Sequence, residues 1–124
     1  MSEFLETAVE AAKSAGQLLR DHYYKDKAVD AYEQYDIKLE LDVLSQNIIS
    51  EVILSHFPEH SIIGEEGDNI SDQSEYHWIV DPIDGTVNYF YGIPHFCVSI
   101  ALKKTKGDQW VLGVIYDPMM DELW

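Results

Sequence analysis

The sequence lacks most of the features that mark secreted, membrane-bound or nucleic-acid-binding proteins. Its single cysteine, Cys97, cannot form an internal disulfide, so nothing points to an oxidising compartment and we expect a cytoplasmic protein. No apolar run approaches the length of a membrane span, and the acidic N-terminus does not have the layout of a signal peptide. Only eight Lys and Arg accompany 23 Asp and Glu, and the net charge of −15 argues against a nucleic acid polymer or an anionic membrane as a partner.

Apolar and aromatic residues, in contrast, are plentiful enough to build a core. Hydrophobic residues make up 46% of the 124 residues and include three Trp, eight Tyr and four Phe. The chain has no internal repeat, low-complexity tract or linker-like segment. We therefore predict a single globular domain over residues 1–124.

The first half of the chain predicts two helices. From Glu3 to about Tyr24 apolar residues recur at the spacing of a one-faced helix. A second helical pattern runs from Val43 to Phe57 and stops at Pro58, with an expected apolar face at Leu44, Ile48, Val52 and either Ile53 or Phe57. Residues 25–42 are charged and turn-like and include a short alternating stretch, which suggests an extended lead-in with its acids at the start of the second helix.

The second half predicts strands. Short apolar runs at Ser61–Ile63 and Tyr76–Val80 each end in acidic residues. Two further runs, Val98–Leu102 and Trp110–Tyr116, are separated by a segment whose Gly107 fits a hairpin turn, so we expect them to pair antiparallel.

The acids that follow the second predicted strand are the strongest chemical signal. Carboxylates at the ends of buried strands are costly unless something compensates their charge, and a divalent cation is the obvious compensation. Mg²⁺ takes oxygen ligands and is typically held by a few carboxylates together with substrate phosphates. We expect Asp81 and Asp84 to lie across a turn, where both can face one ion. A solvated turn capped by an Asp, or a calcium loop, is the alternative.

The residues after Asp84 add a possible anion site. Gly85 lets the backbone approach closely, and Thr86 is a good N-cap for a short helix whose free N–H groups would bind phosphate. A metal site beside phosphate-binding amides suggests phosphoryl chemistry. The alternatives are a purely capping role for Thr86, an N-cap role for Asp42 and a simple surface loop around Glu65.

Several of these motifs also resemble one known family. Gly64-Glu65-Glu66 followed by Trp78 to Thr86, with Asn88, resembles the signature of the inositol monophosphatase family of Mg²⁺-dependent, lithium-sensitive phosphatases. The flanking segments 93–102, 113–118 and 36–42 are similar to elements of the same family, so the resemblance covers essentially the whole chain.

The resemblance implies three sets of site residues. The metal ligands would be Glu65, Asp81, the carbonyl of Ile83, and Asp84. The residues that orient and activate the attacking water would be Asp42, Glu65 and Thr86. The phosphate would be bound by Asp84, Gly85 and Thr86. In such two-metal sites the ions stabilise both the attacking and the leaving oxygen of an in-line displacement, and Mg²⁺ is the implied cofactor.

The resemblance also implies a fold, and it implies that the activity of residues 1–124 alone is limited. The fold is α+β: the N-terminal part of the layered α/β/α/β/α sandwich of sugar phosphatases, two helices followed by a mainly antiparallel sheet. Family members are longer and often form homodimers, so we expect 1–124 to be part of a longer enzyme that is weak or inactive alone. Leu39 stands where the family commonly has Thr, and a family Lys has no clear counterpart near Ala31, so the water network around Asp42 is expected to differ.

Inositol monophosphate is the leading substrate. Relatives in the same fold group act on 3'-phosphoadenosine 5'-phosphate or fructose 1,6-bisphosphate, and these substrates stay open. An alternative from another class is a non-catalytic module that binds metal or forms dimers and keeps the phosphatase motif.

Overall fold

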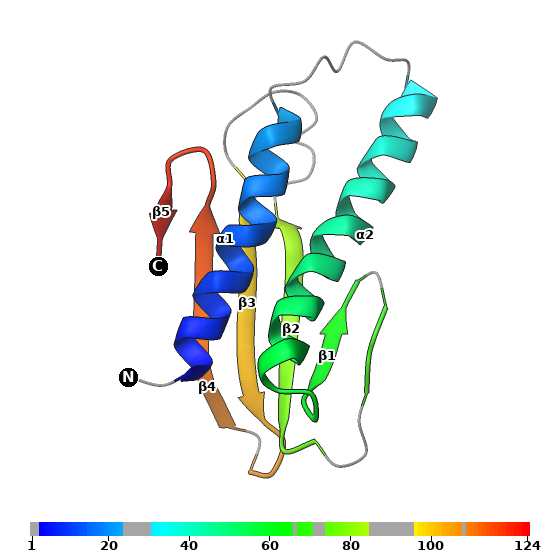
Figure 1. Ribbon diagram of the computed structural model, residues 1–124. Coiled ribbons are helices and arrows are strands. Elements are labelled where there is room, and N and C mark those ends of the chain that lie inside the picture. Colours follow the sequence, from blue (N-terminus) through cyan, green and yellow to red (C-terminus); the bar gives the residue numbers. More distant parts are fainter. Residues whose placement is uncertain (1–2, 24–30, 66, 71–73, 85–95, 108) are drawn as a thin grey trace.

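The chain folds into two helices followed by a five-stranded sheet (Figure 1). The computed structural model describes residues 3–23, 31–65, 67–70, 74–84, 96–107 and 109–124, without the side chains of 23, 31–39 and 84. The elements in chain order are α1 (Glu3–Tyr23), α2 (Ala31–His56), β1 (Ser61–Gly64), β2 (Tyr76–Asp84), β3 (Cys97–Lys104), β4 (Gln109–Asp117) and β5 (Glu122–Leu123).

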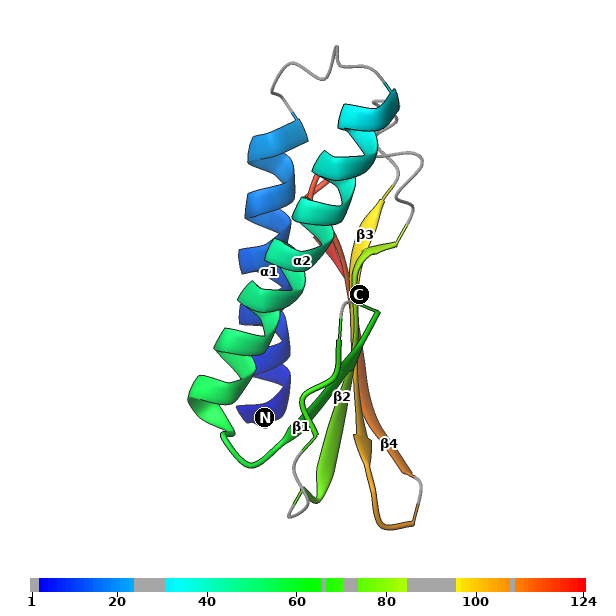
Figure 2. The ribbon, with the colours of Figure 1, turned by 90° about the vertical axis from the view of Figure 1, so that its right-hand side faces the viewer.

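The sheet follows chain order, β1-β2-β3-β4-β5. Only β1 and β2 pair parallel, and every other pair is antiparallel. Both helices lie on one face of this sheet, and no described element covers the other (Figure 2). This confirms the predicted α+β class, with two helices before a mainly antiparallel sheet.

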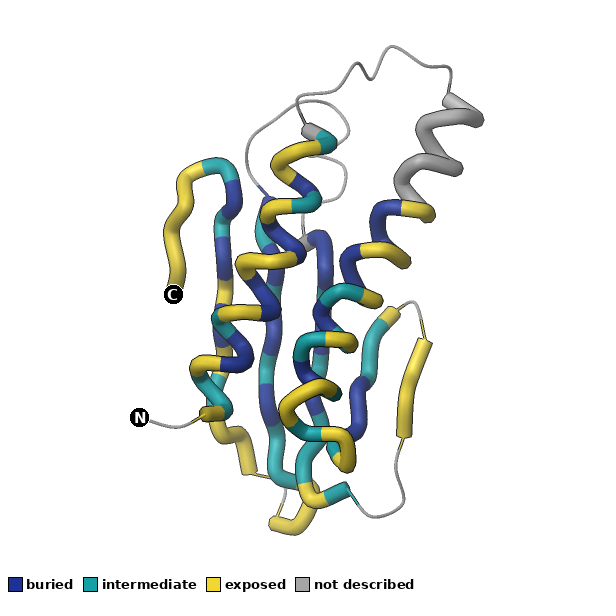
Figure 3. The backbone as a smooth tube through the Cα atoms, viewed as in Figure 1, coloured by how far each residue is buried: buried dark blue, intermediate teal, exposed yellow. Residues whose placement is uncertain are grey.

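Small residues let α1 lie close to the sheet. Its buried positions follow the predicted helical spacing, and Figure 3 shows them turned toward the strands. They are Thr7, Ala8, Ala11, Ala12, Ala15, Gly16 and Leu19. The predicted first helix is thereby confirmed, ending at Tyr23.

The second helix begins earlier than the sequence indicated. It starts at Ala31 rather than Val43, and Asp42 therefore lies in the helix interior and is not its N-cap. Residues 31–42 are rich in Ala, Glu, Gln, Lys and Leu, which favour helix. The predicted apolar face was also misplaced, since Leu44 is 39% exposed. The buried stripe contains three polar residues, which weakens the hydrophobic periodicity: Leu41, Asp42, Ser45, Gln46, Ile49 and Ile53.

Strand alternation separates the two faces of the sheet. In β3 the side chains of Val98, Ile100 and Leu102 are buried against the helices, while Ser99 and Ala101 between them are only partly buried. The predicted hairpin between β3 and β4 is confirmed, and Gly107 has φ +88° in its turn.

One irregularity interrupts β2. The strand continues to Asp84, so the predicted turn between Asp81 and Asp84 is wrong. Asp81 pairs with Ser99 and Asp84 with Cys97, so three steps along β2 match two along β3. Pro82 has no N–H to donate to the ladder, and a β-bulge is where a strand tolerates it.

An aromatic cluster joins the first residues of α1 to the end of α2 and the start of β2. The Trp78 indole Nε1–H donates to Nδ1 of His60 at 2.9 Å, and the His60 ring stacks on Phe57 with centroids 4.7 Å apart. Phe4 and Tyr76 pack on the same imidazole. Burial lowers the pKa of His60 below its ordinary 6.5, although Glu59 and Glu75 act in the opposite direction.

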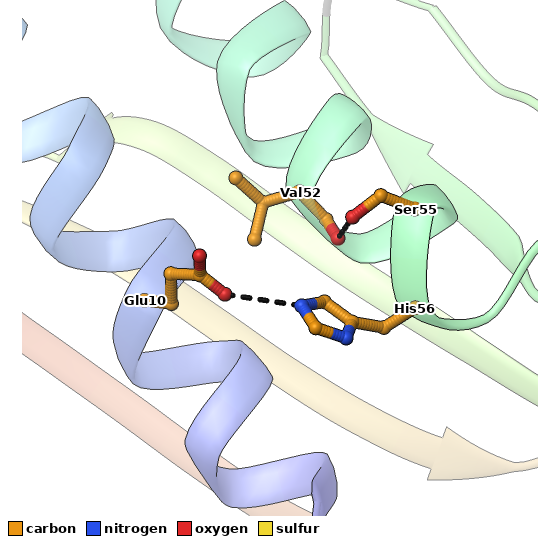
Figure 4. Close-up of polar contacts among 4 residues, drawn as sticks. All are labelled: Glu10, Val52, Ser55 and His56. Carbon is orange, nitrogen blue, oxygen red and sulfur yellow. Dashed lines mark hydrogen bonds and ion pairs between the residues drawn. The ribbon is translucent and has the colours of Figure 1, made fainter.

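A polar contact also connects the outer sides of the helices (Figure 4). Nε2 of His56 lies 3.2 Å from Oε2 of Glu10, and the Ser55 hydroxyl donates to the Val52 carbonyl at 2.7 Å. The two side chains are 50% and 57% exposed, so the pair contributes at most about 1 kcal/mol. Within the described residues, neither helix is long and apolar enough to cross a bilayer.

Tyr116 anchors the turn after β4 against α1. Its hydroxyl donates to Asp121 at 2.6 Å, and Oδ1 of Asp117 accepts from the N–H groups of Met119 and Met120 at 3.0 Å each. Burial, followed by the hydrogen bond and charge of Asp121, raises the pKa of Tyr116 to about 12. A Cβ on Gly16 would lie 2.7 Å from Cδ2 of Tyr116, so α1 needs glycine there.

The His60 cluster predicts a loss of stability in mild acid. Because the folded pKa of His60 is depressed, the unfolded chain takes up its proton first as the pH falls below 6.5, and the free energy of unfolding decreases. Urea unfolding between pH 7.5 and 5.5 should show this slope, and His60→Phe should reduce it. His56→Gln, at a half-exposed histidine, is the control. An equal slope in wild type and His60→Phe would contradict the prediction.

The Gly16 contact predicts that a usually favourable substitution will be harmful. Gly to Ala within a helix normally gains about 1 kcal/mol. Here overpacking against Tyr116 and Pro118 should outweigh that gain and destabilise the fold by about 1–3 kcal/mol. Urea unfolding would measure this, with Ser14→Ala on the exposed side of α1 as the control. A stability equal to or above wild type would show that Tyr116 moves aside freely.

Candidate functional site

A cavity of about 390 Å³ opens where β1 and β2 end. This volume lies in the range of small-ligand sites. Most of its lining belongs to the sheet face that points away from the helices. The lining residues are Ile63, Gly64, Glu65, Ile79, Val80, Asp81, Ser99 and Ala101.

Parallel pairing brings the two acids of this cavity together. In the register of β1 and β2, Gly64 lies opposite Val80, so the next residue of each chain segment is Glu65 and Asp81. Parallel strands end at the same edge of a sheet, and both carboxylates therefore reach one place. The sequence showed that both strands end in acids, and their parallel pairing explains why the acids meet.

The bulge in β2 places a third acidic residue in line with them. Ser99 and Cys97, the partners of Asp81 and Asp84, are two residues apart and therefore share one face of β3. Asp81 and Asp84 are three residues apart in β2, and yet both pair with residues that belong to this one face of β3. In a regular strand, residues three apart would fall on opposite faces.

A tight turn carries Glu65. The Gly67 N–H donates to the Gly64 carbonyl at 3.2 Å, and the Gly64 N–H donates to Oδ1 of Asp68 at 3.2 Å. Gly67 has φ +131°, a conformation that favours glycine. The Glu65 side chain is exposed at the rim of the cavity, accessible to a solute.

The other predicted site residues are placed differently. Asp42 is buried on α2, 9% exposed, and does not line the cavity. The Ile83 side chain is buried in β2, 4% exposed, and the predicted role of its carbonyl stays a prediction. The Asp84 side chain and both Gly85 and Thr86 lie outside the described residues.

The donor chemistry of the cavity suits a hard cation. Two carboxylates from neighbouring strands supply the oxygen ligands that Mg²⁺ prefers. Among side chains whose positions are described, no three acidic, His or Cys groups gather closely enough to enclose an ion. Glu65 and Asp81 therefore fit part of a Mg²⁺ site, and Asp84 is the candidate for a third carboxylate ligand.

Ser99 is a lining residue that sequence reasoning did not single out. It lies on β3 directly opposite Asp81, half-buried on the cavity side. The hairpin prediction paired β3 with β4 and gave no signal for Ser99, because only the pairing of β3 with β2 in the structure places this hydroxyl beside the carboxylate.

Comparisons with known proteins agree with the motifs. A sequence model of the Inositol monophosphatase family matches residues 1–124. Inositol monophosphatase 1 of Solanum lycopersicum is 42% identical over 130 residues, covering 100% of this chain and 46% of the relative. A fructose-1,6-bisphosphatase/inositol-1-monophosphatase of Aquifex aeolicus is 39% identical and covers 100% and 47%. The chain thus spans about half the length of these curated relatives.

A solved structure supports the same assignment. The extragenic suppressor protein suhB from Bartonella henselae superposes with a TM-score of 0.84 at 35% identity, covering 98% of this chain and 47% of that one. The family model and the curated relatives match the whole chain, and the superposition covers 98% of it. The chain therefore belongs to the inositol monophosphatase family.

Proposed function

We propose that this chain forms the metal-binding part of a cytoplasmic, Mg²⁺-dependent phosphatase that hydrolyses a small phosphate monoester, with inositol monophosphate as the first candidate. The observation that carries the proposal is the convergence of Glu65 and Asp81 in one cavity, with the backbone of Asp84 on the same side of the ladder. The name of the Aquifex aeolicus relative favours fructose 1,6-bisphosphate as the second candidate substrate.

In this proposal the residues divide into three tasks. Glu65, Asp81, Asp84 and the Ile83 carbonyl hold Mg²⁺. The amides of Gly85 and Thr86 together with Asp84 hold the substrate phosphate. Glu65 and Thr86 orient the attacking water, with a carboxylate accepting its proton, and the family resemblance adds Asp42 to this set although it is buried on α2 and does not line the cavity. Bound Mg²⁺ would supply positive charge that neutralises the phosphate oxygens and activates the water.

Charge explains why the cation would be needed at all. A chain with net charge −15 repels a phosphate ester, and the two acids of the cavity add to that repulsion locally. A bound divalent ion inverts the field at this point. Substrate binding should therefore depend on the cation.

The uncovered sheet face suggests that the chain works with further structure. Large apolar side chains on β4 and after β5 are exposed: Trp110 59%, Val111 43%, Ile115 44% and Trp124 65%. Exposed apolar surface of this kind usually marks an interface. We propose that a counterpart of the relatives' other half covers this face, and that a second copy can join in a homodimer. The 124-residue chain alone is then weakly active or inactive.

Cation binding provides the first test. Calorimetric titration with Mg²⁺ should detect binding to the 124-residue chain, and Asp81→Asn should weaken it at least about tenfold because a charged oxygen ligand is lost. Glu51→Gln, which removes an exposed carboxylate of α2, should bind like wild type. Equal affinities of wild type and Asp81→Asn would remove Asp81 from the site.

Catalysis provides the second test. Adding the other half of the Solanum lycopersicum relative as a separate polypeptide should raise Mg²⁺-dependent phosphate release from inositol 1-phosphate above that of the chain alone. Asp84→Asn should lower the rescued rate by about a hundredfold or more. Full activity of Asp84→Asn would show that the proposed site is wrong. Tight Mg²⁺ binding without rescue would instead favour the non-catalytic module.

A further inference from the structure

Gln46 is an amide buried on the face of α2 that packs against the sheet. It is 6% exposed and lies one helical turn after Asp42, so both side chains share one face of the helix. The Gln46 Nε2–H donates to the carbonyl of Gly67 at 2.8 Å. The hydrogen bond connects the middle of α2 to the turn after β1, two elements that lie side by side in Figures 1 and 2.

A second contact ties the same amide to the beginning of that turn. A Cβ placed on Gly64 would overlap Oε1, Cδ and Nε2 of Gln46, so the amide group rests on the Gly64 backbone. Gln46 therefore touches both ends of the segment from Gly64 to Gly67. Glu65 lies within this segment.

From this geometry we propose that Gln46 is a positioning residue, which holds the turn so that the Glu65 carboxylate stays beside Asp81. This inference rests on the proposed function, because it assigns Gln46 to the support of the cation site. Gln46 also fixes the turn relative to α2, the helix that carries Asp42. The backbone positions of Glu65, on the turn, and of Asp42, on α2, are thereby fixed relative to each other.

The amide donor is the part of Gln46 that the structure requires. Gly67 is exposed, so water can replace the donor when Gln46 is removed, and the global stability should change little. The turn would lose its tie to the helix, however. A Glu at this position would retain length and shape but would turn a negatively charged acceptor toward the Gly67 carbonyl.

Titration of the 124-residue chain with Mn²⁺, followed by electron paramagnetic resonance, tests the proposal. Gln46→Ala and Gln46→Glu should both bind Mn²⁺ about tenfold more weakly than wild type, as removal of an outer support of a metal ligand typically does. Asn47→Ala, exposed one residue further on the same helix, should bind like wild type. Wild-type affinity in both Gln46 variants would overturn the proposal.

A double-mutant cycle separates positioning from a general structural effect. If Gln46 acts through Glu65, Gln46→Ala should weaken Mn²⁺ binding in the wild type but change it little in a Glu65→Gln background. The same factor in both backgrounds would show that Gln46 does not act through Glu65.

Amide hydrogen exchange makes the test independent of cation binding. Without Mn²⁺, the N–H of Gly67, which donates to Gly64, should exchange faster in both Gln46 variants than in Asn47→Ala. Unchanged exchange would overturn the positioning role. If wild type binds no Mn²⁺, the proposed function fails, and the exchange rates still decide whether Gln46 holds the turn.

Discussion

Close packing of both helices on one face of the sheet is the constraint on which the rest of the structure depends. The alanines of α1 allow the helix backbone to approach the strands, and this commits alternate strand residues such as Trp78 and Ile100 to the core. The intervening residues, including Asp81 and Ser99, must then face the other way. The side of the sheet available for chemistry is thus decided by the helices, although in the described residues they contribute no lining to the cavity.

The bulge in β2 then determines how the two acids of that strand are arranged. A regular strand would send Asp81 and Asp84 to opposite faces, whereas one extra residue in β2 between them lets both pair with residues of a single face of β3. Pro82 is suited to this place because it has no N–H to lose. The departure from regular strand geometry lies at the point where the family motif is densest, as expected when function overrides local regularity.

Much of this arrangement was predictable from the sequence, for reasons that differ between elements. The buried stripe of α1 is apolar except for Thr7, and its alanine spacing predicts the helix well. In α2 the buried stripe includes Asp42, Ser45 and Gln46, so hydrophobic periodicity failed and the helix was placed too late. The sequence showed acids at the ends of β1 and β2 but could not show that these strands pair parallel, because partner and register depend on the whole sheet. The role of Asp42 in orienting water follows from the family resemblance alone, whereas phosphate binding by Gly85 and Thr86 was also predicted from the glycine and the N-cap pattern.

The segment that returns from β1 to β2 has a consequence for association. Both the N–H and the carbonyl of Ile62 bond to Asn69, each at 2.8 Å, on the side of β1 away from β2. At the opposite edge Ile115 and Trp124 exchange a similar pair of bonds. Both outer edges are therefore short: β5 has only two residues, and Ile62 and Asn69 form an isolated bridge beside β1. In the described part of the chain, such short edges offer little backbone for a strand of another molecule to pair with, which limits edge-to-edge polymerisation, the hazard that a half-covered sheet would otherwise carry.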